Sequence, residues 1–268
     1  MSINLENKVV IITGASSGIG KATALAFAKE NASVVLAARR EDRLQELVNE
    51  IQNTGGKALV VKTDISKAEE VENLIQKTLN KFGRIDILIN NAGFGVIALV
   101  EETSIQDMRD IVDTNLMGPF YTMRLAIPLM KKQGYGHIIN ISSVIGRIGT
   151  RWNSAYCATK FGLIGLTESA LVESIGTPIH VSTICPGLTD TEIGLVKRDP
   201  KNHIQNNIWA HGVSAEKVAR KIVHCAKYPK SEVYISWKER FLIFINSLSP
   251  ALILQLRIFL YHYRNKRA

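Results

Sequence analysis

Short apolar runs alternate with longer amphipathic segments from residue 8 to about residue 235 of the chain. The runs are rich in β-branched residues, as in KVVII at 8–12, and predict strands that are buried on both faces. The intervening segments repeat apolar residues at helical spacing and predict helices that cover a sheet. We expect strands at 8–12, 33–38, 58–61, 86–89, 137–141, 179–184 and 233–235, and helices at 21–31, 43–53, 68–82, 104–114, 115–132, 154–174 and 215–228.

This alternation predicts an α/β fold with a doubly wound, Rossmann-like parallel sheet that carries helices on both faces. Right-handed crossovers bring the loops that follow the strands to one edge of the sheet, where ligands bind. Residues 1–237 contain no internal repeat, low-complexity stretch or linker. We therefore expect one domain over residues 1–237, followed by an apolar and basic helical tail over residues 238–268.

The net charge of +9 is unevenly distributed, because residues 238–268 hold six basic residues and one acidic residue. Charge confined to a tail indicates a local partner rather than a nucleic-acid-binding body. The sequence has no zinc-finger spacing, aromatic RNA-binding motif or leucine heptad, so we expect no nucleic-acid partner. Hydrophobic residues make up 46% and charged residues 21% of the chain, which indicates a globular protein rather than a disordered one.

Three cysteines stand far apart at Cys157, Cys185 and Cys225, which excludes a disulfide scaffold. Neither the cysteines nor the six histidines show metal-ligand spacing, so we expect no metal site. The first residues lack a charged segment followed by an apolar run, and we expect no secretory signal. A sparse, odd number of cysteines suits a reducing compartment, and we expect a cytoplasmic protein.

A glycine-rich segment, TGASSGIG at 13–20, comes directly after the first expected strand and before the first expected helix. Glycines let the backbone turn tightly and approach a pyrophosphate, and the helix N-terminus supplies N–H donors and a positive dipole. A lone glycine turn also serves ordinary packing, but this context favours a dinucleotide. The candidate cofactor-binding residues here are Gly14, Ser16, Ser17, Gly18, Ile19 and Gly20.

The second expected strand ends in Arg39 and Arg40 and has no acid at the position where an NAD enzyme holds the ribose 2′-hydroxyl. A guanidinium offers a bidentate match to a 2′-phosphate, which favours NADP over NAD. In the competing interpretation, the two arginines begin a solvated helix and pair with Glu41 or Asp42.

Two further candidates follow the third and fourth expected strands on the same edge. Asp64, with Ile65 beside it, is placed to accept a hydrogen bond from an adenine amino group, or to cap the helix that begins near Ser66. The segment NNAG at 90–93 supplies small residues that let a ribose lie close to the backbone, or forms a plain turn. The cofactor-binding candidates of this segment are Asn91, Ala92 and Gly93.

Tyr156 and Lys160 are four residues apart in an expected helix and therefore share one face. An ammonium beside a phenol favours phenolate and lowers the tyrosine pKa from about 10. Tyr156 is thus a candidate proton donor and acceptor for a carbonyl–alcohol pair. Ser142 and Ser143 end the preceding strand, where a hydroxyl can bond the same substrate oxygen. An ordinary surface pair is the competing interpretation of Tyr156 and Lys160.

In order and spacing, TGASSGIG, NNAG, Asn115, the Ser142 and Ser143 pair, YCATK and the PG at 186–187 resemble the short-chain dehydrogenase/reductase family. The resemblance covers about residues 5 to 235. It implies a nicotinamide cofactor and hydride transfer between an alcohol and a ketone or aldehyde.

By this resemblance the catalytic residues are Tyr156, Lys160, Ser143 rather than Ser142, and Asn115, and Tyr156 and Lys160 are also cofactor-binding residues. Asn115 is implied to kink a helix so that a backbone carbonyl holds a water against the lysine. The implied proton path runs from Tyr156 through a ribose hydroxyl, Lys160 and that water toward Asn115.

The resemblance also extends to the segment after the sixth expected strand. Pro186 and Gly187 are implied to border the cofactor, with Thr189 at the nicotinamide amide and Thr191 at the pyrophosphate. The chain departs from many NADP-using relatives at Ser17, where they carry Lys or Arg. Arg39, helped by Arg40 and Ser16, remains the main candidate for binding a 2′-phosphate.

Residues 241–260 form a run of mainly apolar residues with the length of a membrane span, but Pro250 and Arg257 interrupt it. From Pro250 onward, helical spacing puts Leu252, Leu256, Phe259, Leu260 and Tyr263 on one face. Four interpretations stay open: an interfacial membrane helix, a lid over an apolar substrate pocket, a subunit contact, or packing on its own domain. We expect peripheral membrane contact through residues 238–268, without a span.

We expect an NADP(H)-dependent oxidoreductase that interconverts a ketone or aldehyde and an alcohol on an apolar small molecule, such as a steroid, retinoid or fatty-acyl derivative. Residues 1–237 then serve as a dinucleotide-binding and catalytic domain. One alternative is a 3-oxoacyl thioester reductase of fatty-acid synthesis, and another is a catalytically silent nucleotide-binding regulator. We expect a homodimer or a homotetramer.

Overall fold

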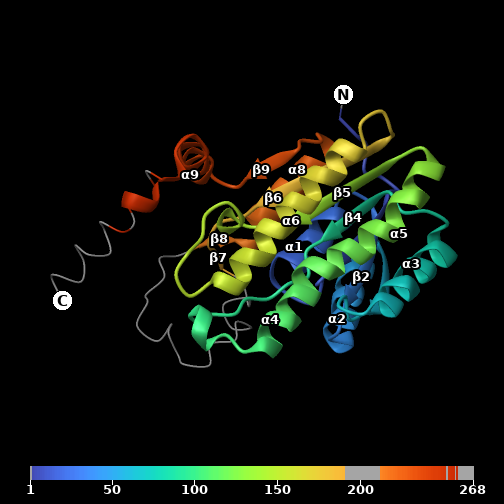
Figure 1. The fold of residues 1–268 in the computed structure, drawn as a ribbon. Coiled ribbons are helices and arrows are strands. Elements are labelled where there is room, and N and C mark those ends of the chain that lie inside the picture. The colour runs from blue at the N-terminus through green and yellow to red at the C-terminus, as the bar shows by residue number, and fades with distance from the viewer. Residues whose placement is uncertain (1, 191–211, 252, 257, 259–268) are drawn as a thin grey trace.

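The structure is a computed structural model that describes residues 2–190, 212–251, 253–256 and 258. A seven-stranded sheet in the order β3-β2-β1-β4-β5-β6-β9 forms its centre (Figure 1). Every neighbouring pair of these strands is parallel. The strands are β1 (Val9–Thr13), β2 (Ser33–Ala38), β3 (Lys57–Lys62), β4 (Ile87–Asn90), β5 (Gly136–Ile141), β6 (Ile179–Cys185) and β9 (Glu232–Tyr234). The predicted doubly wound α/β fold is confirmed.

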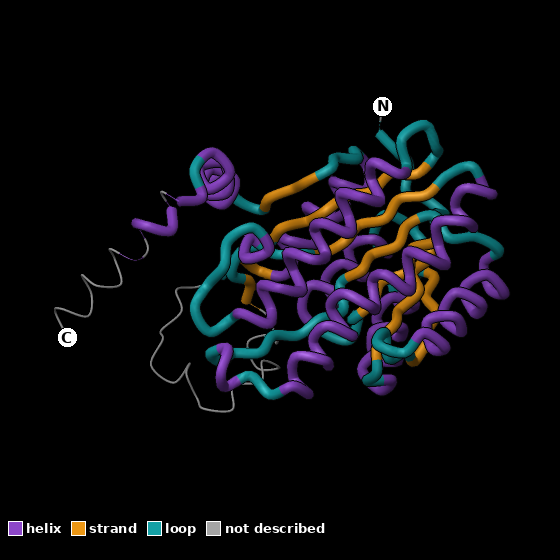
Figure 2. Tube along the Cα trace, in the orientation of Figure 1, coloured by secondary structure: helices purple, strands orange, loops and turns teal. Residues whose placement is uncertain are grey.

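Helices cover both faces of the sheet, as Figure 2 shows in purple around the orange strands. The helices are α1 (Gly18–Ala28), α2 (Glu41–Asn53), α3 (Ala68–Phe82), α4 (Ile105–Val112), α5 (Gly118–Gln133), α6 (Ser154–Glu173), α8 (Ala215–Lys227) and α9 (Trp237–Leu248). Short turns of 3-10 helix lie at Val100–Glu102 and Val144–Gly146, and the short strands β7 (Thr189–Asp190) and β8 (Val213–Ser214) pair with each other.

Successive side chains of β1 point to opposite faces of the sheet and join two separate hydrophobic cores, one on each face. Val10 and Ile12 join the core beneath α1, α2 and α8, whereas Val9 and Ile11 join the core beneath α3, α5 and α6. Successive side chains of a strand point to opposite faces, so a fully apolar strand needs a helical layer on each side. This requirement explains why apolar runs without alternation end up in the middle of the sheet.

Two segments differ from the elements expected from the sequence. The helices expected at 104–114 and 115–132 are joined by a π-helical turn over Asp113–Met117, so no loop separates α4 from α5. The chain after β9 forms α9, which the sequence did not predict as a separate helix. The described residues of 250–258 are also helical, in agreement with the helix expected from Pro250.

Candidate active site

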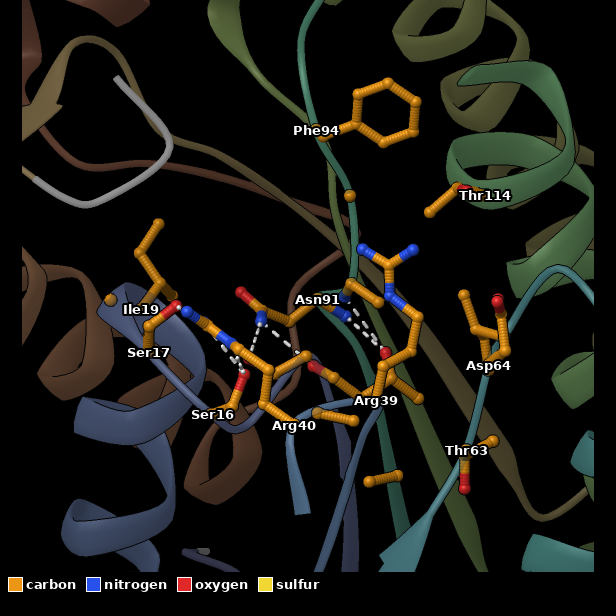
Figure 3. A pocket seen from close by; sticks show the side chains of 18 residues that line it. Ser16, Ser17, Ile19, Arg39, Arg40, Thr63, Asp64, Asn91, Phe94 and Thr114 are labelled. Atoms are coloured by element: carbon orange, nitrogen blue, oxygen red, sulfur yellow. Dashed lines mark hydrogen bonds between the residues drawn. The ribbon is translucent and has the colours of Figure 1, made fainter. Parts of the chain in front are cut away.

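A cavity of about 270 Å³ opens at the carboxyl ends of β1, β2, β3 and β4, around the place where the strand order reverses (Figure 3). Ligands of doubly wound sheets bind at such a switch point. Twelve predicted cofactor-binding residues line it: Gly14, Ser16, Ser17, Gly18, Ile19, Arg39, Arg40, Asp64, Ile65, Asn91, Ala92 and Gly93. Six more lining residues were not singled out from the sequence: Thr13, Ala37, Ala38, Thr63, Phe94 and Thr114.

The glycine turn between β1 and α1 needs glycine at both ends. Gly14 has a φ of +66°, a conformation that side chains with a Cβ rarely adopt. Gly20 lies outside the cavity lining, but a Cβ there would stand 2.2 Å from the carbonyl oxygen of Gly14. The close approach leaves the N-terminus of α1 directed at the cavity, where its N–H groups suit a phosphate.

Thr13 and Asn91 tie the glycine turn to the end of β4. The Thr13 hydroxyl accepts hydrogen bonds from the N–H groups of Asn91 and Ala92, each at 3.0 Å. In return, the Asn91 amide nitrogen donates to the carbonyl oxygens of Thr13 at 2.9 Å and Gly14 at 3.3 Å. These bonds fix two walls of the cavity. The only feature of the sequence that could have indicated this role of Thr13 is its hydroxyl at the end of a strand.

The two arginines after β2 have different roles. Arg40 donates to the hydroxyls of Ser16 at 3.0 Å and Ser17 at 2.8 Å, and so braces the glycine turn. Arg39 is exposed, and its guanidinium extends into the cavity (Figure 3). The guanidinium of Arg39 is thus placed toward a ligand in the cavity, whereas that of Arg40 is placed toward the glycine turn.

Asp64 lies between the cavity and the turn that leads into α3. It lines the cavity, and its Oδ1 accepts hydrogen bonds from the Ser66 N–H at 3.1 Å and the Ser66 hydroxyl at 2.7 Å. Asp64 does not cap α3, because that helix begins at Ala68 after Lys67 and has no side-chain cap; the bonds to Ser66 close a turn ahead of the helix, and Asp64 lies next to Ile65 in the wall of the cavity.

Ser143, Tyr156 and Lys160 come together beside this cavity, from the end of β5 and from α6. The Ser143 side chain shares a hydrogen bond with that of Tyr156. The Lys160 Nζ stands 5.5 Å from the centre of the Tyr156 ring and donates to the carbonyl oxygen of Ile141 at 2.8 Å. The Ser142 hydroxyl instead donates to the backbone carbonyl of Lys160 at 3.2 Å. The choice of Ser143 over Ser142 agrees with this geometry.

Burial acts on the two titratable groups of this cluster in opposite directions. It raises the pKa of Tyr156 above its ordinary value, and the hydrogen bond with Ser143 only partly offsets this effect. Burial also lowers the pKa of Lys160 to about 8. The prediction that Lys160 lowers the Tyr156 pKa is wrong for this arrangement, because the lysine ammonium donates to Ile141 and desolvation of the phenolate dominates.

Asn115 lies fully buried within the π-helical turn. Its amide nitrogen donates to the Phe94 carbonyl at 2.9 Å and to the Thr159 hydroxyl at 3.2 Å, and its Oδ1 accepts from the Phe94 N–H at 3.1 Å. Gly93 separates Asn115 from the lysine, since a Cβ on Gly93 would lie 3.0 Å from Asn115 Oδ1 and 3.8 Å from Lys160 Nζ. The helix distortion expected at Asn115 is present.

The segment after β6 approaches the same cluster. The Pro186 carbonyl accepts a hydrogen bond from the Ser143 hydroxyl at 3.3 Å, which joins this segment to the predicted catalytic serine. Thr189 begins β7 and donates to the Gly187 carbonyl at 3.1 Å. Thr191, the remaining cofactor-binding candidate, lies outside the described residues.

A family model described as short chain dehydrogenase matches residues 8–202. An oxidoreductase of Thermotoga maritima without an assigned substrate is 41% identical over 196 residues, which is 73% of this chain and 77% of the relative. A 3-oxoacyl-(acyl-carrier-protein) reductase of the same organism is 38% identical over 189 residues, or 70% of this chain and 77% of the relative.

Two solved structures share the fold. A short-chain dehydrogenase/reductase of Burkholderia phymatum, in complex with NAD, has a TM-score of 0.87 at 25% identity, with 93% of this chain and 96% of that chain covered. An alcohol dehydrogenase of the archaeon Thermococcus sibiricus, complexed with 5-hydroxy-NADP, has a TM-score of 0.76 at 28% identity and covers 85% of this chain and 95% of its own.

Proposed function

The chain belongs to the short-chain dehydrogenase/reductase family of oxidoreductases, which use an NAD(P) dinucleotide, and on this basis we propose that it is an NADP(H)-dependent enzyme that interconverts a ketone or aldehyde and an alcohol on an apolar small molecule. The observation that carries the proposal is the position of the Ser143, Tyr156 and Lys160 cluster. Gly93 lines the dinucleotide cavity and also lies next to Lys160 Nζ, so the cluster begins where the cavity ends.

The residues of the cluster support proton transfer at an oxygen. A bound nicotinamide supplies or accepts the hydride at the substrate carbon. In the reductive direction, the Tyr156 hydroxyl gives its proton to the carbonyl oxygen while the Ser143 hydroxyl donates a hydrogen bond to the same oxygen. The Lys160 amine, 5.5 Å from the centre of the Tyr156 ring, is the group of this cluster that can return a proton to Tyr156. Oxidation of the alcohol reverses these transfers.

The preference for NADP rests on Arg39 and on the end of β2. The strand ends in Ala37 and Ala38, which line the cavity without a carboxylate that would repel a 2′-phosphate. Arg39 extends into the cavity, and a charge-assisted guanidinium–phosphate pair is among the stronger polar contacts in proteins. Arg40 is engaged with the glycine turn and supports this pair indirectly.

A 3-oxoacyl thioester reductase is the second candidate function, favoured by the 38% identity to the Thermotoga maritima reductase. The two candidates share the same reaction at the carbonyl and differ in the part of the substrate that does not react, because the second requires an acyl thioester beside the ketone. A silent regulator is the weakest alternative, since both Tyr156 and Lys160 are present.

We also propose a homodimer or homotetramer in the cytoplasm. Exposed apolar side chains of α5 and α6, including Phe120, Phe161 and Val172, supply a surface for association. The three cysteines are all free, which suits a reducing compartment. Light scattering at several protein concentrations tests the assembly, and a monomer at all of them contradicts it.

The test of the function is a panel of apolar ketones, aldehydes, alcohols and a 3-oxoacyl thioester, assayed by nicotinamide absorbance with both cofactors. Tyr156→Phe should lower the rate by about 10²–10⁴-fold or more, because it removes general acid–base catalysis. Nucleotide binding, followed by fluorescence, should stay unchanged because Tyr156 lies outside the lining of the dinucleotide cavity. Retained turnover in Tyr156→Phe contradicts the assignment.

A further inference from the structure

Helix α9 has an inner face that docks on the catalytic domain. Ile243 is buried at the centre of this face. One helical turn earlier, Glu239 directs its carboxylate at the backbone of Gly187, where a Cβ would lie 2.0 Å from the carboxylate oxygen. At the next position along the face, the Asn246 amide donates to the carbonyl oxygen of Arg147 at 3.0 Å. The spacing 239, 243 and 246 is that of one helix face, so the orientation of α9 is fixed.

The outer face of α9 is a stripe of large apolar side chains. Trp237, Phe241, Phe244 and Leu248 follow one another at helical spacing, with 74%, 58%, 56% and 69% of their surfaces exposed. Leu242 beside them is 47% exposed. A contiguous exposed apolar patch of this kind marks an interaction surface, since single exposed apolar residues are common but a stripe is not.

Further apolar side chains are exposed in the described part of the chain after α9. Ile253 is buried, whereas Leu254, Leu256 and Ile258 are about half exposed. Among the described residues, no helix has the length and apolar character needed to cross a membrane. The exposed side chains therefore need a partner that covers them from one side.

The charges around this stripe are cationic. Lys238 and Arg240 are exposed at the start of α9. The acid between them, Glu239, faces the protein and accepts hydrogen bonds from the N–H groups of Ser236 and Gly187. Of the residues after 237, the sequence adds basic side chains at Arg257, Arg264, Lys266 and Arg267 and no further acid.

The exposed apolar side chains of α9 and the cations beside them together indicate which kind of partner covers this face. A second copy of α9, paired face to face, would bring two strongly cationic segments together, which opposes association. A lid over the substrate would need the aromatic side chains to point at the site, but the inner face toward Gly187 carries Glu239, Ile243 and Asn246 instead. Aromatic and aliphatic side chains beside exposed Lys and Arg are what an interfacial helix presents to lipid.

We propose that the outer face of α9, centred on Trp237, Phe241 and Phe244, binds the surface of an anionic lipid bilayer. The helix lies in the plane of the headgroups with its aromatic side chains in the apolar boundary, and Lys238 and Arg240 contact anionic headgroups. The site of attachment lies at the far end of the molecule from α3 (Figure 1).

Membrane binding also has a consequence for the active site, and this consequence alone rests on the proposed function. Glu239 contacts Gly187, and the neighbouring Pro186 carbonyl accepts a hydrogen bond from Ser143. The lipid-facing helix is thus joined through two contacts to the catalytic cluster. An apolar carbonyl compound dissolved in the bilayer would be presented on this side of the enzyme.

The experiment is flotation of the full chain with vesicles of phosphatidylcholine alone or phosphatidylcholine mixed with phosphatidylglycerol, at low and high salt. The triple variant Trp237→Ser, Phe241→Ser and Phe244→Ser removes the stripe. Its control is Ile175→Ser with Tyr228→Ser, which removes side chains that are 77% and 44% exposed elsewhere on the molecule. A second variant, Lys238→Ser with Arg240→Ser, removes charge but keeps the stripe.

The wild type and the control should float with the anionic vesicles, and less so at high salt because the headgroup attraction is screened. The triple variant should lose about tenfold or more of its vesicle partitioning. The charge variant should lose binding to anionic vesicles and become less sensitive to salt. The proposal is overturned if the wild type stays with the unbound fraction, or if both variants float as the wild type does. A change of oligomeric mass in the triple variant, without a change in flotation, assigns the face to a second copy and also overturns it.

Discussion

Burial, rather than the neighbouring charge, controls the resting protonation of Tyr156 and Lys160. Removing water raises the pKa of the phenol and lowers that of the amine to about 8, so both groups are pushed toward their neutral forms. Lys160 keeps its charge below pH 8 and loses it as the pH rises through that value. With both groups favoured in their neutral forms, the suitability of the cluster for proton transfer rests on its geometry. Ser143 is hydrogen-bonded to Tyr156, and Lys160 lies above the Tyr156 ring.

Arg39 should decide between the two nicotinamide dinucleotides. In the double variant Ala38→Asp with Arg39→Ser, the new carboxylate repels a 2′-phosphate and can accept from a 2′-hydroxyl. The lost charge-assisted bonds are worth about 1.5–3 kcal/mol each, so NADPH affinity should fall by about 10- to 150-fold while NADH affinity rises. Fluorescence titration of both nucleotides measures the change.

The control is Arg220→Ser, which removes an exposed guanidinium on α8 outside the dinucleotide cavity. It should leave both affinities unchanged. A wild type that already binds NADH more tightly than NADPH contradicts the role given to Arg39.

At the scale of elements, periodicity predicted the body of the molecule closely. The helix expected at 68–82 is α3, and the strand expected at 33–38 is β2. Helix starts were less accurate, because α1 begins at Gly18 inside the glycine turn, where glycine-rich sequence argues against a helix. The first turn of α1 instead packs closely against Gly14, where Gly20 leaves no room for a Cβ.

The parts that the sequence did not predict depend on contacts between distant segments. The π-helical turn at Asp113–Met117 carries an ordinary helical sequence, and its extra residue is accommodated by the bonds of Asn115 to Phe94 and Thr159. The start of α9, by contrast, has a local signal that was overlooked: Ser236 and Glu239 form a capping box, in which the Glu239 carboxylate accepts from the Ser236 N–H at 3.0 Å. Twelve cavity residues were nevertheless predicted, because motifs that follow parallel strands must meet at one edge.

The junction of β1 and α1 can be tested through Gly20. In Gly20→Ala the added Cβ would meet the Gly14 carbonyl oxygen at 2.2 Å, and backbone cannot yield as a flexible side chain can. The helix N-terminus must then move away from the cavity, and nucleotide affinity should fall by about tenfold or more, since the donors of an anion site act only at close range.

The matched control is Gly165→Ala in the middle of α6, where an added Cβ has no atom within 4 Å. Alanine is favoured over glycine in a helix by roughly 0.5–1 kcal/mol, so this variant should unfold at a slightly higher temperature and bind nucleotide normally. Equal nucleotide affinities of the two variants would show that Gly20 is not needed for close approach.

At the scale of the whole molecule, buried amides join strands β4 and β5 to α5 and to α6, the helix that carries Tyr156 and Lys160. Asn90 donates to Asn140 at 2.8 Å and accepts from the Thr122 hydroxyl at 2.7 Å, and Asn140 donates to the Thr167 hydroxyl at 2.8 Å. The chain of bonds runs from β4 and β5 to α5 and α6. A satisfied buried network of this kind rigidifies the core, so α6 presents Tyr156 and Lys160 in one fixed register.

The stability of the molecule at mildly acid pH should depend on His137 in β5. This side chain is fully buried beside His180, and burial lowers its pKa to about 3. Its Nε2 pairs with the Ser182 hydroxyl at 2.8 Å, and in the described part of the structure its Nδ1 has no partner. An added proton would therefore be a buried charge without compensation.

Since the unfolded chain takes up a proton near pH 6.5 and the folded chain only near pH 3, the contribution of His137 to stability is complete above pH 6.5 and is lost as the pH falls. As the pH falls below 6.5, His137 should therefore lower the free energy of unfolding with a slope that approaches about 1.4 kcal/mol per pH unit. His137→Gln removes the titrating group and should flatten the slope between pH 6.5 and 5, where ordinary carboxylates stay charged. Urea unfolding at half-unit pH steps measures it, with His224→Gln on the exposed side of α8 as the control. If His137→Gln and wild type show parallel declines, or if the control flattens the slope equally, His137 is not the group that destabilises the fold in acid.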